Sequence, residues 1–249
     1  MAGVLRVVAL PARTGLRSNQ GGRQDLGGWR CARFPAFVPP PQSPMNFQLY
    51  YITDRNQIQP QPLDGFIARA IAAGVDWVQI REKDLPARGL LSLTATAVEQ
   101  ARRRSTRVIV NDRLDVALAA KAHGVHLGTR SMPLDVVRKL APEEFAVGAS
   151  CHSLAEALAA QAGGADYILL GPIFSTPSKL QYGPPLGLAV LREVTTQLSI
   201  PVFALGGISV DRVPLCRQNG AAGIAGIRVF QDSDSLDDLV RELRAAGQP

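Results

Sequence analysis

The chain has 249 residues and 27 basic against 21 acidic side chains, which gives a net charge of +6. Six of the basic residues and one acidic residue lie within the first 44, so the net charge of the remainder falls to +1 and offers no argument for nucleic-acid binding. No run approaches the roughly 20 apolar residues of a membrane span. Three widely spaced cysteines indicate reduced thiols. We therefore expect a cytoplasmic protein that binds neither nucleic acid nor membrane.

The first 44 residues differ in kind from the rest. They combine six arginines with a single acid, Asp25, and with many glycines and prolines, which predicts a disordered extension over 1–44 and a folded domain over 45–249. Met45 stands directly before the first predicted strand. This favours the interpretation that translation truly starts at Met45 and that residues 1–44 are upstream sequence included by read-through. An organelle transit peptide, which is also Arg-rich and acid-poor, and a functional basic arm are the alternatives.

Eight short apolar runs follow one another, separated by segments with helical spacing such as Leu90, Leu93, Ala97 and Ala101. This alternation predicts parallel strands with crossover helices. A doubly wound open sheet would give the same alternation, but eight units and two late glycine-rich segments favour an α/β fold with a single (β/α)8 TIM barrel. The predicted strands are 48–53, 77–81, 107–111, 125–127, 146–150, 167–171, 202–205 and 223–228.

Cationic and amide side chains follow the second predicted strand. Gln79, Arg81 and Lys83 alternate along the chain, so we expect all three on the face that lines the barrel and opens into an active site. A guanidinium fork and an ammonium point charge together suit a di- or triphosphate. The alternative is a surface ion pair between Arg81 and Glu82.

The third and fifth predicted strands also end in polar residues. Asn111 is the last residue of its strand and is aimed at a ligand, whereas Asp112 either caps the helix predicted over 114–121 or serves as an oxygen ligand of Mg²⁺. Ser150 and His152 share one face, and His152 is a candidate general acid or base. Cys151 points away from that face, which disfavours it as a nucleophile.

Later segments suggest sites for phosphate. Thr176, Ser178 and Lys179 form an anion-binding cluster on a connection long enough to cover the barrel mouth, unless this is an ordinary surface turn rich in Ser, Pro and Gly. The glycines of 206–207 and 223–228 allow backbone amides to approach a phosphate closely.

Six motifs occur along the chain, at 51–54, 79–83, 111–113, 124–128, 176–179 and 206–208. In order and spacing they resemble the thiamine phosphate synthase family, which includes the thiazole tautomerases of TenI type. The resemblance covers about residues 47–245 and implies a Mg²⁺-dependent transferase that joins hydroxymethylpyrimidine diphosphate to hydroxyethylthiazole phosphate and releases pyrophosphate. It implies a dissociative reaction in which the bond to pyrophosphate breaks first.

The resemblance also implies roles for individual residues. Lys83 and Lys179 would be catalytic, Ser150 would lie near the pyrimidine, and Asp112 would bind Mg²⁺. Phosphorylated pyrimidine and thiazole substrates would be the partners, and a homo-oligomer is left open. The diphosphate would be held by Gln79, Arg81, Lys83, Asn111 and Lys179, and the thiazole phosphate by Thr176, Ser178, Gly187, Gly207, Ile227 and Arg228.

Two positions depart from the family pattern. Ser131 stands where a second carboxylate ligand of Mg²⁺ is usual, and Arg228 replaces a small hydroxyl residue, which would strengthen phosphate binding or obstruct the pocket. Loss of the carboxylate favours the alternative of a thiazole tautomerase with His152 as general acid or base. A protein that binds thiazole or thiamine phosphate without turnover is the third interpretation.

Overall fold

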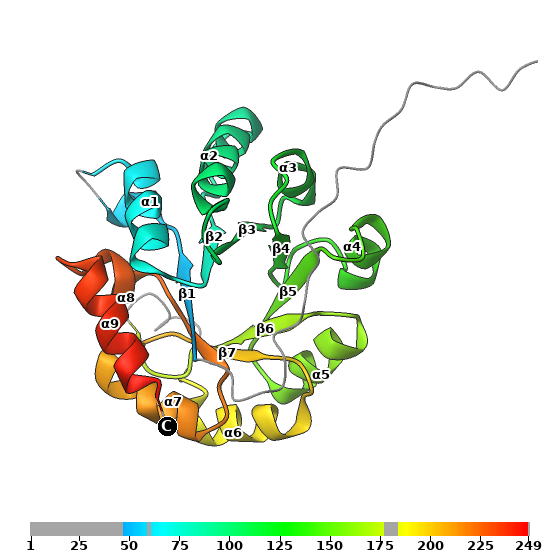
Figure 1. The fold of residues 1–249 in the computed structure, drawn as a ribbon. Helices are drawn as coiled ribbons and strands as arrows, with labels where there is room; N and C mark the ends of the chain where they lie inside the picture. Colours follow the sequence, from blue (N-terminus) through cyan, green and yellow to red (C-terminus); the bar gives the residue numbers. More distant parts are fainter. Residues whose placement is uncertain (1–46, 59–60, 177–183, 249) are drawn as a thin grey trace, which may run out of the picture. The chain divides into compact units, whose positions relative to one another are not determined.

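The computed structural model describes residues 47–58, 61–176 and 184–248. Within them, eight parallel strands pair in the order β1 to β8 and close into a barrel, with helices around the outside (Figure 1). The predicted TIM barrel is therefore confirmed. The extension predicted over 1–44 and the start proposed at Met45 lie outside the described residues.

The strands fall where the apolar runs predict them, within one or two residues at most ends. The last run is shorter than expected, because Arg228 begins a helix. The strands are β1 (Gln48–Ile52), β2 (Trp77–Ile80), β3 (Arg107–Asn111), β4 (Gly124–Leu127), β5 (Ala146–Cys151), β6 (Tyr167–Leu170), β7 (Val202–Leu205) and β8 (Gly223–Gly226).

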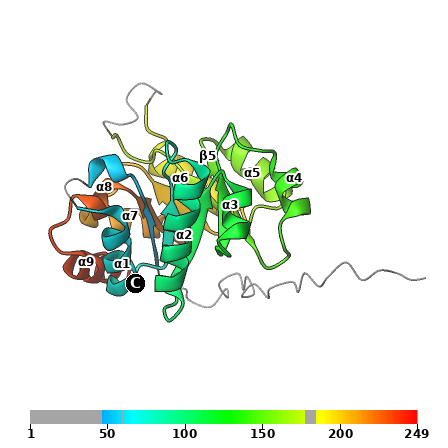
Figure 2. The same ribbon diagram turned by 90° about the horizontal axis from the view of Figure 1, so that it is seen from above.

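Helices alternate with these strands along the chain, and α9 packs beside α1 to close the outer ring (Figure 1). Figure 2 shows α2 and α3 side by side along the barrel wall. The described helices are η1 (Arg55–Gln57), α1 (Leu63–Ala73), α2 (Ala87–Ala101), α3 (Leu114–Ala119), α4 (Leu134–Leu140), α5 (Leu154–Ala162), α6 (Gly187–Gln197), η3 (Val210–Arg212), α7 (Val213–Gln218), α8 (Arg228–Gln231) and α9 (Leu236–Ala246).

The alternation of side chains divides the core in two. Branched and small side chains on the outward face of each strand pack against the helices and form the larger cluster. The inward face carries an aromatic layer in which Tyr50 stacks on Trp77 with ring centroids 5.6 Å apart, and Tyr167 and Phe203 pack against both rings. The Tyr50 and Tyr167 hydroxyls lie 2.9 Å apart. This layer fills the barrel toward the ends at which the strands begin.

Several helix ends follow directly from local sequence. Ser153 and Ser235 accept backbone N–H bonds at the starts of α5 and α9. Gly74 ends α1 with φ +94°, a conformation that favours glycine. None of the helices in the described parts of the chain is long and apolar enough to cross a membrane.

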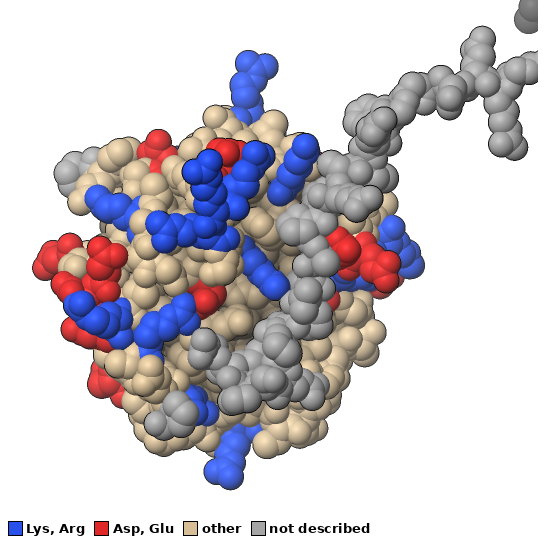
Figure 3. Space-filling model, in the orientation of Figure 1, with Lys and Arg blue, Asp and Glu red and all other residues tan. Residues whose placement is uncertain are grey.

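The connection from α2 to β3 carries a cluster of arginines. Lys and Arg side chains gather over α2 on the face drawn in Figure 3, and Arg102, Arg103 and Arg104 directly follow that helix and are exposed. Connections from helix to strand lie at the strand amino ends, so this cluster is at the end of the barrel opposite the polar residues that follow the strands.

Candidate active site

A chain of two amides and a carboxylate runs from the barrel interior to its exposed rim where β2 and β3 end. Gln79 is buried, and its Nε2 donates to Oδ1 of Asn111 at 3.0 Å. Asn111 in turn donates from Nδ2 to Oδ2 of Asp112 at 3.3 Å. The Gln79 Oε1 atom is buried and has no hydrogen-bond partner within the described residues. The structure thus brings together three of the predicted site residues and leaves one acceptor to be satisfied.

Asp112 has an unusual backbone for a residue with a side chain, with φ +64°. Its Oδ1 accepts a hydrogen bond from the Ser131 hydroxyl, which itself accepts from the Gly128 amide at 2.6 Å. The helix α3 begins after Arg113 with no side-chain cap. The interpretation of Asp112 as a helix cap is therefore wrong, because the left-handed backbone places its carboxylate beside the loop that follows β4. Strain of this kind concentrates at functional sites.

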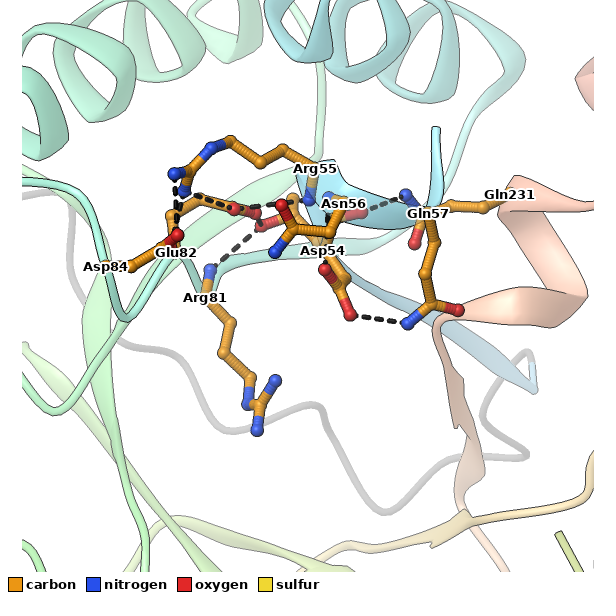
Figure 4. A network of polar contacts seen from close by, with 9 residues as sticks. Asp54, Arg55, Asn56, Gln57, Arg81, Glu82, Asp84 and Gln231 are labelled. Carbon is orange, nitrogen blue, oxygen red and sulfur yellow. Dashed lines mark hydrogen bonds and ion pairs between the residues drawn. The ribbon is translucent and has the colours of Figure 1, made fainter. Parts of the chain in front are cut away.

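Glu82 organises the loops that follow β1 and β2 (Figure 4). It is buried, and its carboxylate accepts from the Thr53 hydroxyl at 2.6 Å and from the Arg55 amide at 3.2 Å. Thr53 Oγ1 also accepts from the backbone amide of Arg81 at 2.9 Å. The expected alternative, an Arg81–Glu82 surface pair, is wrong, since Arg55 is the residue that pairs with both Glu82 and Asp84.

Figure 4 shows the consequence for Arg81. Its guanidinium points away from Glu82 toward the barrel interior, although its backbone is tied to the Thr53–Glu82 pair. The side chain is partly buried, whereas Lys83, two residues later, is exposed. Sequence analysis had treated Glu82 as a surface residue. The sequence signal for its role is an acidic residue directly after a buried strand, because such a carboxylate needs hydrogen-bond donors. Thr53 and Arg55, which follow the neighbouring strand β1, are the donors.

A second polar pair joins β4 and β5 and connects Ser150, a predicted site residue, to His126, to which sequence analysis gave no role. His126 is 1% exposed, and its Nε2 lies 2.8 Å from Oγ of Ser150. Its ring packs against Tyr167 at 5.7 Å between centroids. Burial, with a smaller contribution from the charge on Arg81, lowers the pKa of His126 to about 3. The imidazole is therefore neutral at physiological pH. The alternation of side chains along β4 places His126 on the inward face, and this was the sequence signal that could have identified it as a site residue.

His152 lies just beyond β5 and is exposed. Its Nδ1 donates to the Gly171 carbonyl, which accepts, and its backbone N–H donates to Glu156 at 2.7 Å. With Nδ1 as the donor, Nε2 is the nitrogen that can accept a proton. Cys151 is buried on the opposite, outward face, and burial raises the pKa of its thiol to about 12. Cys151 is accordingly unsuited to act as a nucleophile.

Two glycines shape the connection that follows β7. Gly206 and Gly207 have φ +96° and +64°, and a Cβ on Gly207 would come within 2.6 Å of the Ser175 carbonyl oxygen. Arg212 donates to the Gly207 carbonyl at 2.6 Å and lies over the Phe174 ring at 4.8 Å. This loop and the one that follows β6 are therefore held close together, and only glycine fits at position 207.

The remaining predicted residues lie around the same end of the barrel. Gly187 begins α6 with φ +78° and has open space where a Cβ would lie, Ile227 directly precedes α8, and Thr176 is half-buried. Arg228 forms an ion pair with Asp232 at 3.1 Å, and its side chain is exposed. Ser178 and Lys179 lie outside the described residues.

The carboxylate of Asp112 is the natural place to test for Mg²⁺. The described residues contain no group of three or more His, Cys, Asp or Glu side chains that could hold a metal by themselves. Mg²⁺ sites commonly use one or two carboxylates and take the other oxygens from substrate phosphates and water. One carboxylate with a hydroxyl and an amide beside it fits that arrangement and does not fit a metal held by protein ligands alone.

Comparison with known proteins agrees with this geometry. A family model described as thiamine monophosphate synthase matches residues 49–230. A relative from Geobacter sulfurreducens is 48% identical over 205 residues, which are 82% of this chain and 96% of its own. The thiamine-phosphate synthase of Methanocella arvoryzae is 40% identical over 201 residues, covering 81% of this chain and 95% of its own.

Solved structures give the same result. The thiamine phosphate pyrophosphorylase from Pyrococcus furiosus superimposes with a TM-score of 0.74 at 35% sequence identity, and the match covers 81% of this chain and 96% of that one. The predicted resemblance is confirmed in both sequence and fold. The chain belongs to the thiamine monophosphate synthase family.

Proposed function

We propose that this protein is a thiamine phosphate synthase, which joins hydroxymethylpyrimidine diphosphate to hydroxyethylthiazole phosphate and releases pyrophosphate. The observation that carries the proposal is the group formed by Arg81 and the hydrogen-bonded chain Gln79–Asn111–Asp112 where β2 and β3 end. A departing pyrophosphate needs a cation, amide donors and a metal ligand in one place, and this group supplies all three kinds.

The residues have separate tasks in this reaction. The Arg81 fork binds two phosphate oxygens at once, and Asn111 orients the diphosphate from the end of β3. Asp112 would hold Mg²⁺ from the protein side. When bound, Mg²⁺ supplies charge neutralisation for the leaving group. Lys83 and Lys179 add positive charge in the proposed mechanism. Ser150 contacts the pyrimidine, and the thiazole phosphate is bound by Thr176, Ser178, Gly187, Gly207 and the backbone at Ile227 and Arg228.

The test is to incubate the full-length protein with both substrates and Mg²⁺ and to look for thiamine phosphate by chromatography. We expect product, and we expect EDTA to abolish it. Asp112→Asn should lower the rate about 100-fold or more while the protein stays folded, because Asn tolerates the left-handed backbone at this position. Asp115→Asn is the matched control, since Asp115 is exposed and pairs with Arg113. A folded wild-type protein that makes no product would contradict the proposal.

One observation favours a thiazole tautomerase as the second candidate. His152 donates from Nδ1 to Gly171, so its Nε2 is available as a base, and a proton transfer within a thiazole carboxylate phosphate requires neither metal nor pyrophosphate. The assay is isomerisation of that phosphate in the presence of EDTA. Activity that survives EDTA and is lost in His152→Gln would support this candidate. Ligand binding without product, whatever metal is supplied, would indicate a binding protein.

A further inference from the structure

His126 lies within the barrel with one ring nitrogen paired and the other unpaired. Its Nε2 is 2.8 Å from Oγ of Ser150, whereas its Nδ1 is buried and has no hydrogen-bond partner among the residues that the structure describes. The ring is fully enclosed and contacts Tyr167. A neutral imidazole carries one N–H, on one nitrogen or the other.

The surroundings distinguish the two tautomers. A proton on Nδ1 would bury an N–H donor with no acceptor, and buried N–H groups without a partner are rarer in proteins than buried acceptors without one. A proton on Nε2 is instead used in the hydrogen bond to Ser150 and leaves only a lone pair unmatched. The contacts therefore favour the Nε2–H tautomer, in which His126 donates and Ser150 accepts.

This assignment determines what Ser150 can offer a ligand. Its oxygen already accepts from His126, so the hydroxyl proton remains to be donated elsewhere. Ser150 shares the inward face of β5 with Gly148, whose lack of a side chain leaves room for the Tyr167 ring. Ser150 is a partly exposed residue, in contrast to the buried His126 beside it.

We propose that His126 is a positioning residue that fixes the Ser150 hydroxyl as a hydrogen-bond donor, so that the substrate atom at Ser150 is an unprotonated ring nitrogen of the pyrimidine. The inference rests on the proposed function, which places the pyrimidine at Ser150. It goes further by assigning the direction of the hydrogen bond. A ring with C–H or N–H at that position could not accept the hydrogen bond that the Ser150 hydroxyl donates. Such a ring would therefore bind less tightly.

The tautomer can be measured directly, because the three histidines of the chain provide their own references. His123 accepts the Val108 N–H on Nδ1 at 3.0 Å, so its proton is on Nε2, whereas His152 donates from Nδ1 to Gly171. Long-range ¹H–¹⁵N spectra of the full-length protein at about pH 8, where an ordinary imidazole is neutral, would compare all three rings. We expect His126 to match His123. A His126 spectrum that matches His152 would overturn the proposal.

The functional test compares three ligands by calorimetry, with Mg²⁺ and without the thiazole. One ligand is hydroxymethylpyrimidine diphosphate, and the other two are its analogues with C–H in place of one or the other ring nitrogen. The wild type should bind one analogue about tenfold more weakly, the value of one neutral hydrogen bond. Ser150→Ala and His126→Phe, which retains a ring against Tyr167, should reduce that discrimination to under about twofold.

His126→Gln should restore the discrimination, because its amide can also donate to Ser150. A merely structural role for His126 would lower affinity for every ligand equally, so a His126→Phe protein that still discriminates would overturn the proposal. If the wild type binds none of these ligands, the proposed function fails and the pyrimidine assignment fails with it. The spectra would still decide separately whether His126 orients Ser150.

Discussion

The Ser131 hydroxyl donates a hydrogen bond to the Asp112 carboxylate and accepts one from the Gly128 amide. A neutral side chain thus connects the loop after β4 to the carboxylate that we propose as the Mg²⁺ ligand. This pairing holds Asp112 in place without adding negative charge, so the oxygens of a substrate diphosphate would supply most of the charge around the metal.

Ser131→Asp should strengthen Mg²⁺ binding at this site. A second carboxylate beside Asp112 repels it in the absence of metal and attracts a divalent cation, so we expect at least about a tenfold gain in Mg²⁺ affinity together with a lower metal-free melting temperature. Calorimetric titration of Mg²⁺ in the presence of pyrophosphate measures the first effect. Ser131→Ala, which removes the hydroxyl and adds no charge, is the control and should show no gain. An unchanged Mg²⁺ dependence in Ser131→Asp would reject this account.

Glu82→Gln should destabilise the fold although Glu82 contacts no proposed substrate. The buried carboxylate accepts bonds from Thr53 and Arg55, and a neutral amide cannot match them, so we expect the free energy of unfolding to fall by about 2–3 kcal/mol. Urea unfolding measures it. Asp84→Asn is the matched control, because Asp84 pairs with the same arginine but is exposed, and it should have little effect. Equal effects of the two substitutions would contradict the role assigned to Glu82.

His126 should make the protein sensitive to acid. Its folded pKa is lowered to about 3, whereas an unfolded histidine titrates near about 6.5, so between these values the unfolded state binds a proton that the folded state does not. The stability is therefore fully present above about pH 6.5 and falls by up to about 1.4 kcal/mol per pH unit as the pH drops. His126→Gln should remove this component. The measurement is urea unfolding of the wild type and of His126→Gln between about pH 4 and 7. If the free energy of unfolding depends on pH in the same way in both proteins, the pKa of His126 is not lowered in the folded state.

The described cysteines should be unreactive while the protein is folded. Burial raises the pKa of Cys151 to about 12 and that of Cys216 to about 11, which leaves at most about one thiolate in a thousand at pH 8. In a Cys31→Ser protein, iodoacetamide should label both thiols only after denaturation, as read by mass spectrometry. Rapid labelling of the native protein, with activity lost in parallel, would argue for a functional thiol.

The barrel could be predicted from the sequence because its two periodicities are local. Strand residues alternate between the inner and outer cores, and the same alternation predicted Gln79 on the inward face, where it bonds to Asn111. It also predicted Lys83 there, and Lys83, which lies beyond the end of β2, is exposed. The partners of charged side chains could not be predicted in this way. Arg55 pairs with Glu82 across two loops that meet only once β1 and β2 lie side by side.

Backbone conformation was the second feature of the site that could not be predicted from the sequence. The sequence pattern around Asp112 is typical of a helix cap, but the left-handed turn at that residue directs the carboxylate elsewhere, and no residue type other than glycine signals such a turn strongly. His126 was given no role for a different reason. A histidine within an apolar run is compatible with a structural role, and only its contact with Ser150 links it to the site.

The aromatic layer at the base of the barrel determines the side from which substrates enter the site and products leave it. Tyr50, Trp77, Tyr167 and Phe203 fill the interior at the end where the strands begin, so molecules enter and leave past the loops at the other end. Ser150 lies within β5, whereas Gly207 lies beyond the end of β7, so we expect a ligand that contacts Ser150 to lie deeper in the barrel than one held at Gly207. The deeper ligand must therefore arrive first and depart last, which predicts an obligatory order of substrate addition in steady-state kinetics.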